Sequence, residues 1–270
     1  MATDSWVVDG PQVIEVDDVR RLRIGLVGGR ADVVVHDEDV VRLEVHRVDG
    51  RPLEVTYRDG ELHVGYSFTL GIWDQFLDSL RHFGGRDRAD VHVAVPAHVA
   101  VRLGTVSAEG LLAGVQEDSS VSTVSGSAVV DGTRGSLAAK TVSGDLAVRG
   151  HAGPLSLNSV SGEVAASGDL SVVSAHTVSG RLTLDVSSAT SSISAQSVSG
   201  DVTLRLPEGQ GLRVTGSSVS GRLVVDGQEY GGTTPGRRTV DLASGDGTCH
   251  VQATTVSGNV TVLRRGAQPV

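Results

Sequence analysis

The chain is 270 residues long, with 39% hydrophobic and 20% charged side chains, a composition that is typical of a folded domain and excludes a disordered chain. Its formal net charge of −9 excludes a broad basic surface, so we expect no nucleic-acid partner. No apolar run approaches the roughly 20 residues that cross a bilayer, so we expect no integral membrane segment.

The N-terminal residues lack the basic and apolar regions of a secretory signal. We therefore expect a cytoplasmic protein, with association with the cell envelope as the alternative. The single cysteine, Cys249, has no partner for an intramolecular disulfide. Glycine is enriched, at 35 of 270 residues, which predicts turns at many places along the chain.

Residues 1–104 differ from the rest of the chain, because they contain seven of its eight aromatic residues. Runs of β-branched and alternating apolar residues predict strands there at 33–35, 41–45, 53–55, 62–64 and 91–95. We expect this segment to be β-rich and to cap the open end of the repeats that follow it.

One stretch near 70–83 has a helical period, which predicts a short amphipathic helix. The helix either covers the first repeat or presents its aromatic stripe to a partner protein or a second subunit. An anionic membrane surface is disfavoured because the polar face is as acidic as it is basic. The candidate partner-binding residues are the apolar residues of this stripe: Leu70, Trp73, Phe76, Leu77, Leu80 and Phe83.

The remaining chain, residues 105–265, is dominated by an internal repeat of the tripeptide Val-Ser-Gly. The tripeptide begins at Val124, Val142, Val160, Val178, Val198, Val219 and Val256, with spacings of 18, 18, 18, 20, 21 and 37 residues. Apolar residues recur four and six positions after each of these valines, as at Leu146 and Val148. A second apolar pair precedes each tripeptide, as at Leu137 and Ala139.

Two short strands and two bends in about 18 residues predict one rung of a parallel β-solenoid, a β-helix or β-roll in which equivalent residues stack roughly 4.8 Å apart. An antiparallel meander is the alternative, and the handedness of the solenoid stays open. The alternation extends backwards from Val148 to Val142, so we expect the valine of each tripeptide to face the core. A bend is expected near residues 141, 159 and 177, where the alternation changes phase.

The 37-residue spacing before Val256 leaves a surplus near 227–249, which we expect to be an insertion, forming a loop, or one irregular rung. The strand at 258–265 is expected to close the solenoid, because its two terminal arginines discourage further stacking. Residues 266–270 form a tail.

The sequence offers little catalytic chemistry. Asp145 and Glu163 occupy equivalent positions on neighbouring rungs, where a glycosidase would place a carboxylate pair, but an exposed ladder of alternating charge explains them better. The nine histidines show no metal-binding spacing, and no Gly-rich phosphate loop precedes a helix. Serine and threonine ladders beside the bends are typical of solvated or internally bonded hydroxyls rather than an ice-binding face. We predict no catalytic, cofactor-binding or metal-binding residues.

The repeated unit, as in Thr141-Val-Ser-Gly-Asp-Leu146 and Ser197-Val-Ser-Gly-Asp-Val202, resembles a bacterial β-strand-repeat family of unknown function labelled "putative adhesin", in its actinobacterial form. The resemblance implies a non-catalytic β-solenoid that is linked to cell-envelope stress in some members. Three hypotheses follow, in order: a scaffold or protein-interaction module that binds a protein partner or itself, an adhesin-like protein that binds a glycan or a cell surface, and a polysaccharide-active enzyme.

Overall fold

The computed structural model describes residues 3–66, 87–230, 238–245 and 247–265. These residues form 24 strands and no helix, which confirms the all-β prediction. The helix predicted near 70–83 and its six candidate residues lie outside the described residues. The chain forms two compact units, Met1–Gly135 and Ser136–Val270. The domain division expected after residue 104 stays a prediction.

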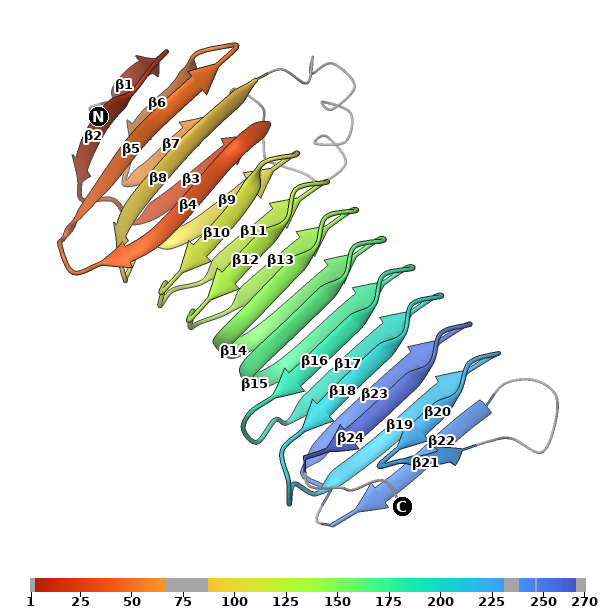
Figure 1. Ribbon diagram of the computed structural model, residues 1–270. Coiled ribbons are helices and arrows are strands. Elements are labelled where there is room, and N and C mark those ends of the chain that lie inside the picture. The colour runs from red at the N-terminus through yellow and green to blue at the C-terminus, as the bar shows by residue number, and fades with distance from the viewer. Residues whose placement is uncertain (1–2, 67–86, 231–237, 246, 266–270) are drawn as a thin grey trace. The chain divides into compact units, whose positions relative to one another are not determined.

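The first unit contains twelve strands that form two stacks (Figure 1). The first stack has the order β1-β6-β7-β3-β9-β11, and the second has the order β2-β5-β8-β4-β10-β12. The inner strands pair in parallel, whereas β1, β6, β2 and β5 pair antiparallel at the outer end. The strands are β1 (Thr3–Val8), β2 (Gln12–Asp17), β3 (Arg21–Leu26), β4 (Gly28–His36), β5 (Val40–Asp49), β6 (Leu53–Arg58), β7 (Glu61–Gly65), β8 (Arg88–Pro96), β9 (Ala100–Thr105), β10 (Glu109–Ala113), β11 (Ser119–Thr123) and β12 (Ala128–Asp131).

The order of strands in the first unit differs from their order in the sequence. Leu22 of β3 pairs with Leu62 of β7 on one side and with Val101 of β9 on the other. The rung made of β3 and β4 therefore lies between the rung of β7 and β8 and the rung of β9 and β10. All five strand runs predicted in residues 1–104 are confirmed, within β4, β5, β6, β7 and β8.

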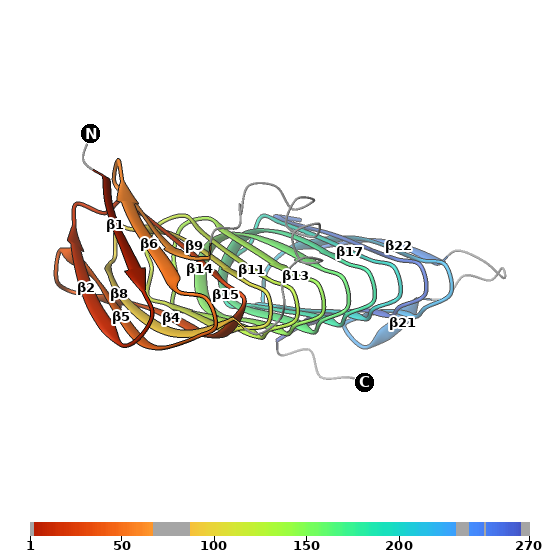
Figure 2. The same ribbon diagram turned by 90° about the horizontal axis from the view of Figure 1, so that it is seen from above.

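The second unit also has two stacks of parallel strands, with the orders β13-β14-β15-β17-β23-β19 and β14-β15-β16-β18-β24-β20. The long strands β14 and β15 contribute to both stacks. Figure 2 shows the successive rungs as layers that follow one another. The strands are β13 (Leu137–Thr141), β14 (Leu146–Ser159), β15 (Val164–Thr177), β16 (Leu182–Val186), β17 (Ser192–Ser197), β18 (Val202–Leu206), β19 (Leu212–Ser218), β20 (Leu223–Val225), β21 (Gln228–Tyr230), β22 (Arg238–Ser244), β23 (Cys249–Thr255) and β24 (Val260–Arg264).

The pairing partners in this unit keep a constant offset over only part of its length. Leu146, Val164 and Leu182 pair in turn and are 18 residues apart, whereas Val202 follows Leu182 by 20 residues. Parallel pairing with such offsets is a β-solenoid-like arrangement, and it excludes the antiparallel meander for these strands.

The last rung in the sequence is not the last rung in space. Val260 of β24 pairs with Val202 on one side and with Leu223 on the other, so β23 and β24 lie between the rung of β17 and β18 and the rung of β19 and β20 (Figure 1). The expectation that the strand at 258–265 closes the solenoid is therefore wrong. Two antiparallel strands, β22 beside β19 and β21 beside β20, cover that edge instead, and they occupy part of the segment expected to be a loop.

The predicted apolar columns form the core. Each of the residues predicted four and six positions after a repeat valine is at most 6% exposed, and those that precede the tripeptides are equally buried. The valine of the tripeptide is the exception, because Val160, Val178 and Val198 are 44–48% exposed. The expectation that these valines face the core is wrong: the bend falls within Val-Ser-Gly itself, and the buried residue at that level is the preceding Thr or Ser.

Candidate binding surfaces

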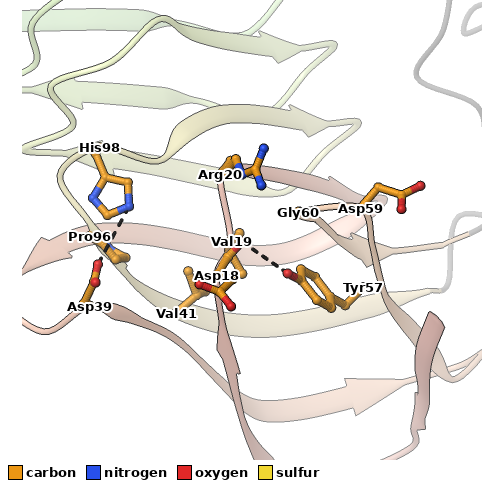
Figure 3. A pocket seen from close by; sticks show the side chains of 10 residues that line it. All are labelled: Asp18, Val19, Arg20, Asp39, Val41, Tyr57, Asp59, Gly60, Pro96 and His98. Atoms are coloured by element: carbon orange, nitrogen blue, oxygen red, sulfur yellow. Dashed lines mark hydrogen bonds and ion pairs between the residues drawn. The ribbon is translucent and has the colours of Figure 1, made fainter. Parts of the chain in front are cut away.

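A polar pocket of about 600 Å³ lies in the first unit, where four chain connections meet (Figure 3). The link from β2 to β3 supplies Asp18 and Arg20, and the link from β4 to β5 supplies Asp39. Tyr57 comes from the end of β6, and His98 comes from the link between β8 and β9. The remaining lining residues are Val19, Val41, Asp59, Gly60 and Pro96.

Hydrogen bonds fix the walls of this pocket. The Tyr57 hydroxyl donates to the Asp18 carbonyl oxygen at 3.2 Å, and the backbone N–H of Arg20 donates to the Gly60 carbonyl oxygen at 2.8 Å. His98 Nε2 lies 3.8 Å from Asp39 Oδ1 at the exposed rim. The pocket thus combines carboxylates, a guanidinium and an aromatic ring, which is a set that binds polar ligands.

Two non-glycine residues of the pocket have backbones in the left-handed region. Asp18 has a φ of 57° and Asp59 has a φ of 52°. Asp59 and Gly60 form the two-residue loop of the β6–β7 hairpin, where Asp-Gly is favoured because both residues need a positive φ. This dipeptide is the sequence signal that could have placed a hairpin here. The pocket itself was not predictable, since its walls are far apart in the sequence.

The second surface is a row of exposed valines at the bends of the second unit, which we call the valine ridge. Backbone hydrogen bonds between successive bends fix the order of its members. Five of the six are 44–50% exposed, and the first is half-buried. In spatial order, the ridge is Val142, Val160, Val178, Val198, Val256 and Val219.

Hydroxyl groups close the bends on both sides of each ridge valine. On the buried side, Thr177 Oγ1 donates to the Gly180 carbonyl oxygen at 3.3 Å and accepts from the Gly180 N–H at 3.2 Å. On the exposed side, Ser179 Oγ donates to the Val160 carbonyl oxygen of the neighbouring bend at 3.2 Å. Of the two arrangements expected, solvated or internally bonded, these hydroxyls therefore have the second, and their hydrogens are turned away from solvent.

The glycine of each bend is required by close stacking. A Cβ atom at Gly180 would lie 2.0 Å from the carbonyl oxygen of Gly162, and one at Gly200 would lie 1.9 Å from that of Gly180. The signal for the exposed valine was present in the preceding strand: Leu137, Ala139 and Thr141 alternate inward, which turns the next residue outward.

A ladder of charged and amide side chains follows the same bends, three residues after each valine, and we call it the charge ladder. Its spatial order, fixed by backbone pairing, is Asp145, Glu163, Arg181, Asp201, Asn259 and Arg222.

Asp145 and Glu163 are neighbours on this ladder, as the sequence predicted, but each is engaged within it. The Asp145 carboxylate accepts the Glu163 N–H at 3.0 Å, and Glu163 Oε1 lies 3.8 Å from Arg181 Nη1. Neither residue lines the polar pocket. These contacts support the interpretation as a charge ladder rather than a catalytic pair.

The other chemistry-bearing groups do not gather into a centre. Within the described ranges, no group of three or more His, Cys, Asp or Glu side chains could hold a metal ion. Cys249 is free and fully buried, and burial raises the pKa of its thiol to about 11. Across the same described residues, the structure holds no helix that is both long and apolar enough to pass through a membrane.

Two solved structures are similar to the chain at low sequence identity, and the first of them shares its fold. A "putative lipid binding protein" from Parabacteroides distasonis is 12% identical, with a TM-score of 0.54, over 94% of this chain and 97% of that protein. A "putative cell adhesion protein" from Clostridium sporogenes is 11% identical, with a TM-score of 0.30, over 94% of this chain and all of that protein. No curated protein sequence shows significant similarity to the chain. The family model described as Toastrack DUF4097 matches residues 166–263, about a third of the chain.

Proposed function

We propose that the protein is a non-catalytic scaffold whose valine ridge binds another protein chain. The observation that carries the proposal is the ridge itself. A valine that is 44–50% exposed occurs at five of the six bends, at a position where packing within the unit does not require an apolar residue. Contiguous exposed apolar surface of this kind marks interaction sites on soluble proteins.

The neighbouring groups make the ridge suited to being covered. The exposed serines of the bends, such as Ser161 and Ser179, donate their hydroxyl hydrogens to backbone carbonyl oxygens. A partner that covers the ridge therefore leaves no serine donor unsatisfied, which would otherwise oppose binding. The charge ladder beside the ridge supplies a polar rim, as in other protein interfaces.

Site-specific cross-linking in the native host tests this proposal. A photo-reactive amino acid at Val178 on the ridge is compared with the same amino acid at Val172, which is 44% exposed on β15 and lies off the ridge. We expect discrete protein adducts from the ridge position and none from Val172. Equal products, or no products at either position, would overturn the proposal.

A second candidate function, the binding of a glycan, is favoured by the polar pocket. Carboxylates such as Asp18 and Asp59 accept hydrogen bonds from sugar hydroxyls, and the Tyr57 ring offers an apolar face. This lining favours a sugar over an acyl chain. Calorimetry with a panel of oligosaccharides tests the candidate. Asp59→Asn should abolish binding while it preserves the left-handed turn, and Asp37→Asn, an exposed carboxylate outside the pocket, should not.

Location in the cytoplasm, a link to cell-envelope stress and the lack of enzymatic activity stay predictions. Fractionation of native cells checks the first, because recovery of the protein from the cell surface would contradict it. The third hypothesis, a polysaccharide-active enzyme, requires that Asp145→Asn and Glu163→Gln abolish a measured glycan cleavage without unfolding the protein.

A further inference from the structure

We propose that the partner of the valine ridge is a second copy of this chain, packed antiparallel about a two-fold axis that passes between the levels of Val178 and Val198. The inference rests on the proposed function and deepens it by naming the partner. A two-fold interface must be self-complementary, because the same surface is contributed by both copies. The charge ladder meets this condition in one arrangement.

The order of the ladder makes it self-complementary when it is reversed. From one end to the other, its six levels are acidic, acidic, basic, acidic, amide and basic. An antiparallel copy centred on the ladder places Asp145 opposite Arg222 and Arg181 opposite Asp201. The remaining pair places the Glu163 carboxylate opposite the amide of Asn259, which can donate to it. Each of the three kinds of contact is therefore attractive.

Other arrangements of two copies lack this property. A parallel arrangement in which the two ladders face each other places every charged level opposite itself, which gives five repulsive contacts of like charge. An antiparallel arrangement shifted by one level towards the Asp145 end places Glu163 opposite Asp201 and Arg181 opposite itself. A shift in the other direction places Asp201 opposite itself. Rim charges select the register of an interface in this way, while its apolar centre supplies most of the affinity.

The centre of the ridge provides that apolar contact. Val178 and Val198, the two valines beside the axis, are 47% and 48% exposed. Their flanking serines, Ser179 and Ser199, already donate to the carbonyl oxygens of Val160 and Val178. Each valine at the axis would be buried twice in the dimer, once on each copy, so substitutions there have a doubled effect.

Sedimentation velocity of the full chain across micromolar concentrations tests the proposal. We expect a reversible dimer for the native protein, and a dissociation constant raised at least about tenfold by Val178→Ser. Val172→Ser, at an exposed valine off the ridge, is the matched control and should leave the dissociation constant unchanged.

A mixing experiment separates the intermolecular contact from any effect within one chain. Arg181→Glu alone and Asp201→Lys alone should each weaken the dimer about tenfold, because like charges then face each other twice across the axis. An equimolar mixture of the two variants should restore the dimer, since both contacts become attractive. Arg213→Glu, an exposed arginine on β19, is the control for charge.

Three results of the sedimentation and mixing experiments would overturn this inference: a monomer at all concentrations, a dimer that Val178→Ser does not weaken, and a mixture that dimerises no better than its components. If Val178→Ser fails to fold, the mixing experiment decides. Adducts from Val178 with a different protein would overturn the second copy as partner and leave the proposed scaffold function intact. The failure of the inference and the failure of the function are therefore distinguishable.

Discussion

The side chain of Arg264, on β24, binds the carboxylate of Asp226, which lies in the turn between β20 and β21. Arg264 Nε and Nη2 lie 2.9 Å and 2.6 Å from Asp226 Oδ2, and the Arg264 backbone N–H donates to Asp226 Oδ1 at 3.0 Å. Arg264 Nη1 also donates to Ser244 Oγ at the end of β22. One guanidinium therefore joins the inserted rung to both antiparallel strands that close the unit.

Loss of this contact should destabilise the end of the second unit that β21 and β22 cover. We expect Arg264→Gln to lower the free energy of unfolding by about 1–3 kcal/mol, because a charge-assisted, partly buried pair is lost. Chemical denaturation measures the loss. Arg213→Gln, an exposed substitution, should change stability by less than about 0.5 kcal/mol. Equal effects of the two substitutions would show that the Arg264 contact contributes nothing beyond an ordinary surface arginine.

The stacked glycines should tolerate no side chain. Gly180→Ala would place a Cβ atom 2.0 Å from the carbonyl oxygen of Gly162, which is backbone and cannot turn aside. We expect a loss of about 3 kcal/mol or more in unfolding free energy, or failure to fold. Gly10→Ala, at a position with no atom within 4 Å, is the matched control and should be nearly neutral. A stable Gly180→Ala variant would mean that the bends at Gly162 and Gly180 lie further apart than in this structure.

The buried hydroxyl of each bend is expected to be needed for its hydrogen bonds rather than for its volume. Thr177→Val keeps the shape but leaves the Gly180 N–H and carbonyl oxygen without their hydroxyl partner, which should cost about 1–3 kcal/mol in thermal or chemical unfolding. Thr177→Ser keeps the hydroxyl, as the equivalent residues Ser159 and Ser197 do, and should cost less. If both variants lose the same stability, packing of the methyl group dominates instead.

The sequence predicted the core far better than the order of the rungs. Leu146, Val164 and Leu182 could be assigned to one column because their spacing is regular and each has an apolar neighbour two residues on. The position of Val260 between Val202 and Leu223 could not be assigned, because a spacing of 37 residues is the same whether the last rung follows the previous one or inserts before it. Contacts far apart in the sequence, such as that of Arg264 with Asp226, decide between the two.

The candidate surfaces were less predictable for a related reason. The alternation from Val148 back to Val142 predicts a buried valine only if the strand is unbroken. The bend within Val-Ser-Gly interrupts it, so the alternation alone does not predict the valine ridge. The Asp-Gly dipeptides at 59–60 and 226–227 both form two-residue hairpin loops with positive φ, and they were the local signals for the antiparallel strands at the ends. The pocket could not be predicted from the sequence, because its lining residues come from separate segments that no repeat relates to one another.

Acid should weaken the first unit through Asp87. Its carboxylate accepts from Arg51 N, Nε and Nη2 at 2.7–3.0 Å, and this bonding holds the pKa of Asp87 below its usual range. A carboxyl group whose pKa is lower in the folded state stabilises the fold above its unfolded pKa of about 3.9, and that stabilisation is lost as the pH falls through the folded pKa. The pair should therefore be fully effective at pH 7.

Comparison with a neutral variant isolates this group from the other carboxylates. Asp87→Asn should be less stable than the native protein at pH 7, and the difference should shrink as the pH falls below about 4. Asp37→Asn, at an exposed position, should show no comparable difference. Denaturant unfolding at a series of pH values measures both. A difference for Asp87→Asn that does not change with pH would show that Arg51 does not depend on the ionised carboxylate.

The thiol of Cys249 offers a direct probe of the inserted rung, because it begins β23 and is fully buried. With a pKa of about 11, the thiol is almost entirely protonated at pH 8, and only the thiolate reacts with iodoacetamide. We expect alkylation of the native protein to be at least about a hundredfold slower than in denaturant, since the strand must open first. Arg264→Gln should accelerate the reaction about tenfold if it lowers the free energy of opening β23 by about 1.4 kcal/mol. Arg213→Gln should not accelerate it, and a native rate equal to the unfolded rate would contradict the placement of β23 between two rungs.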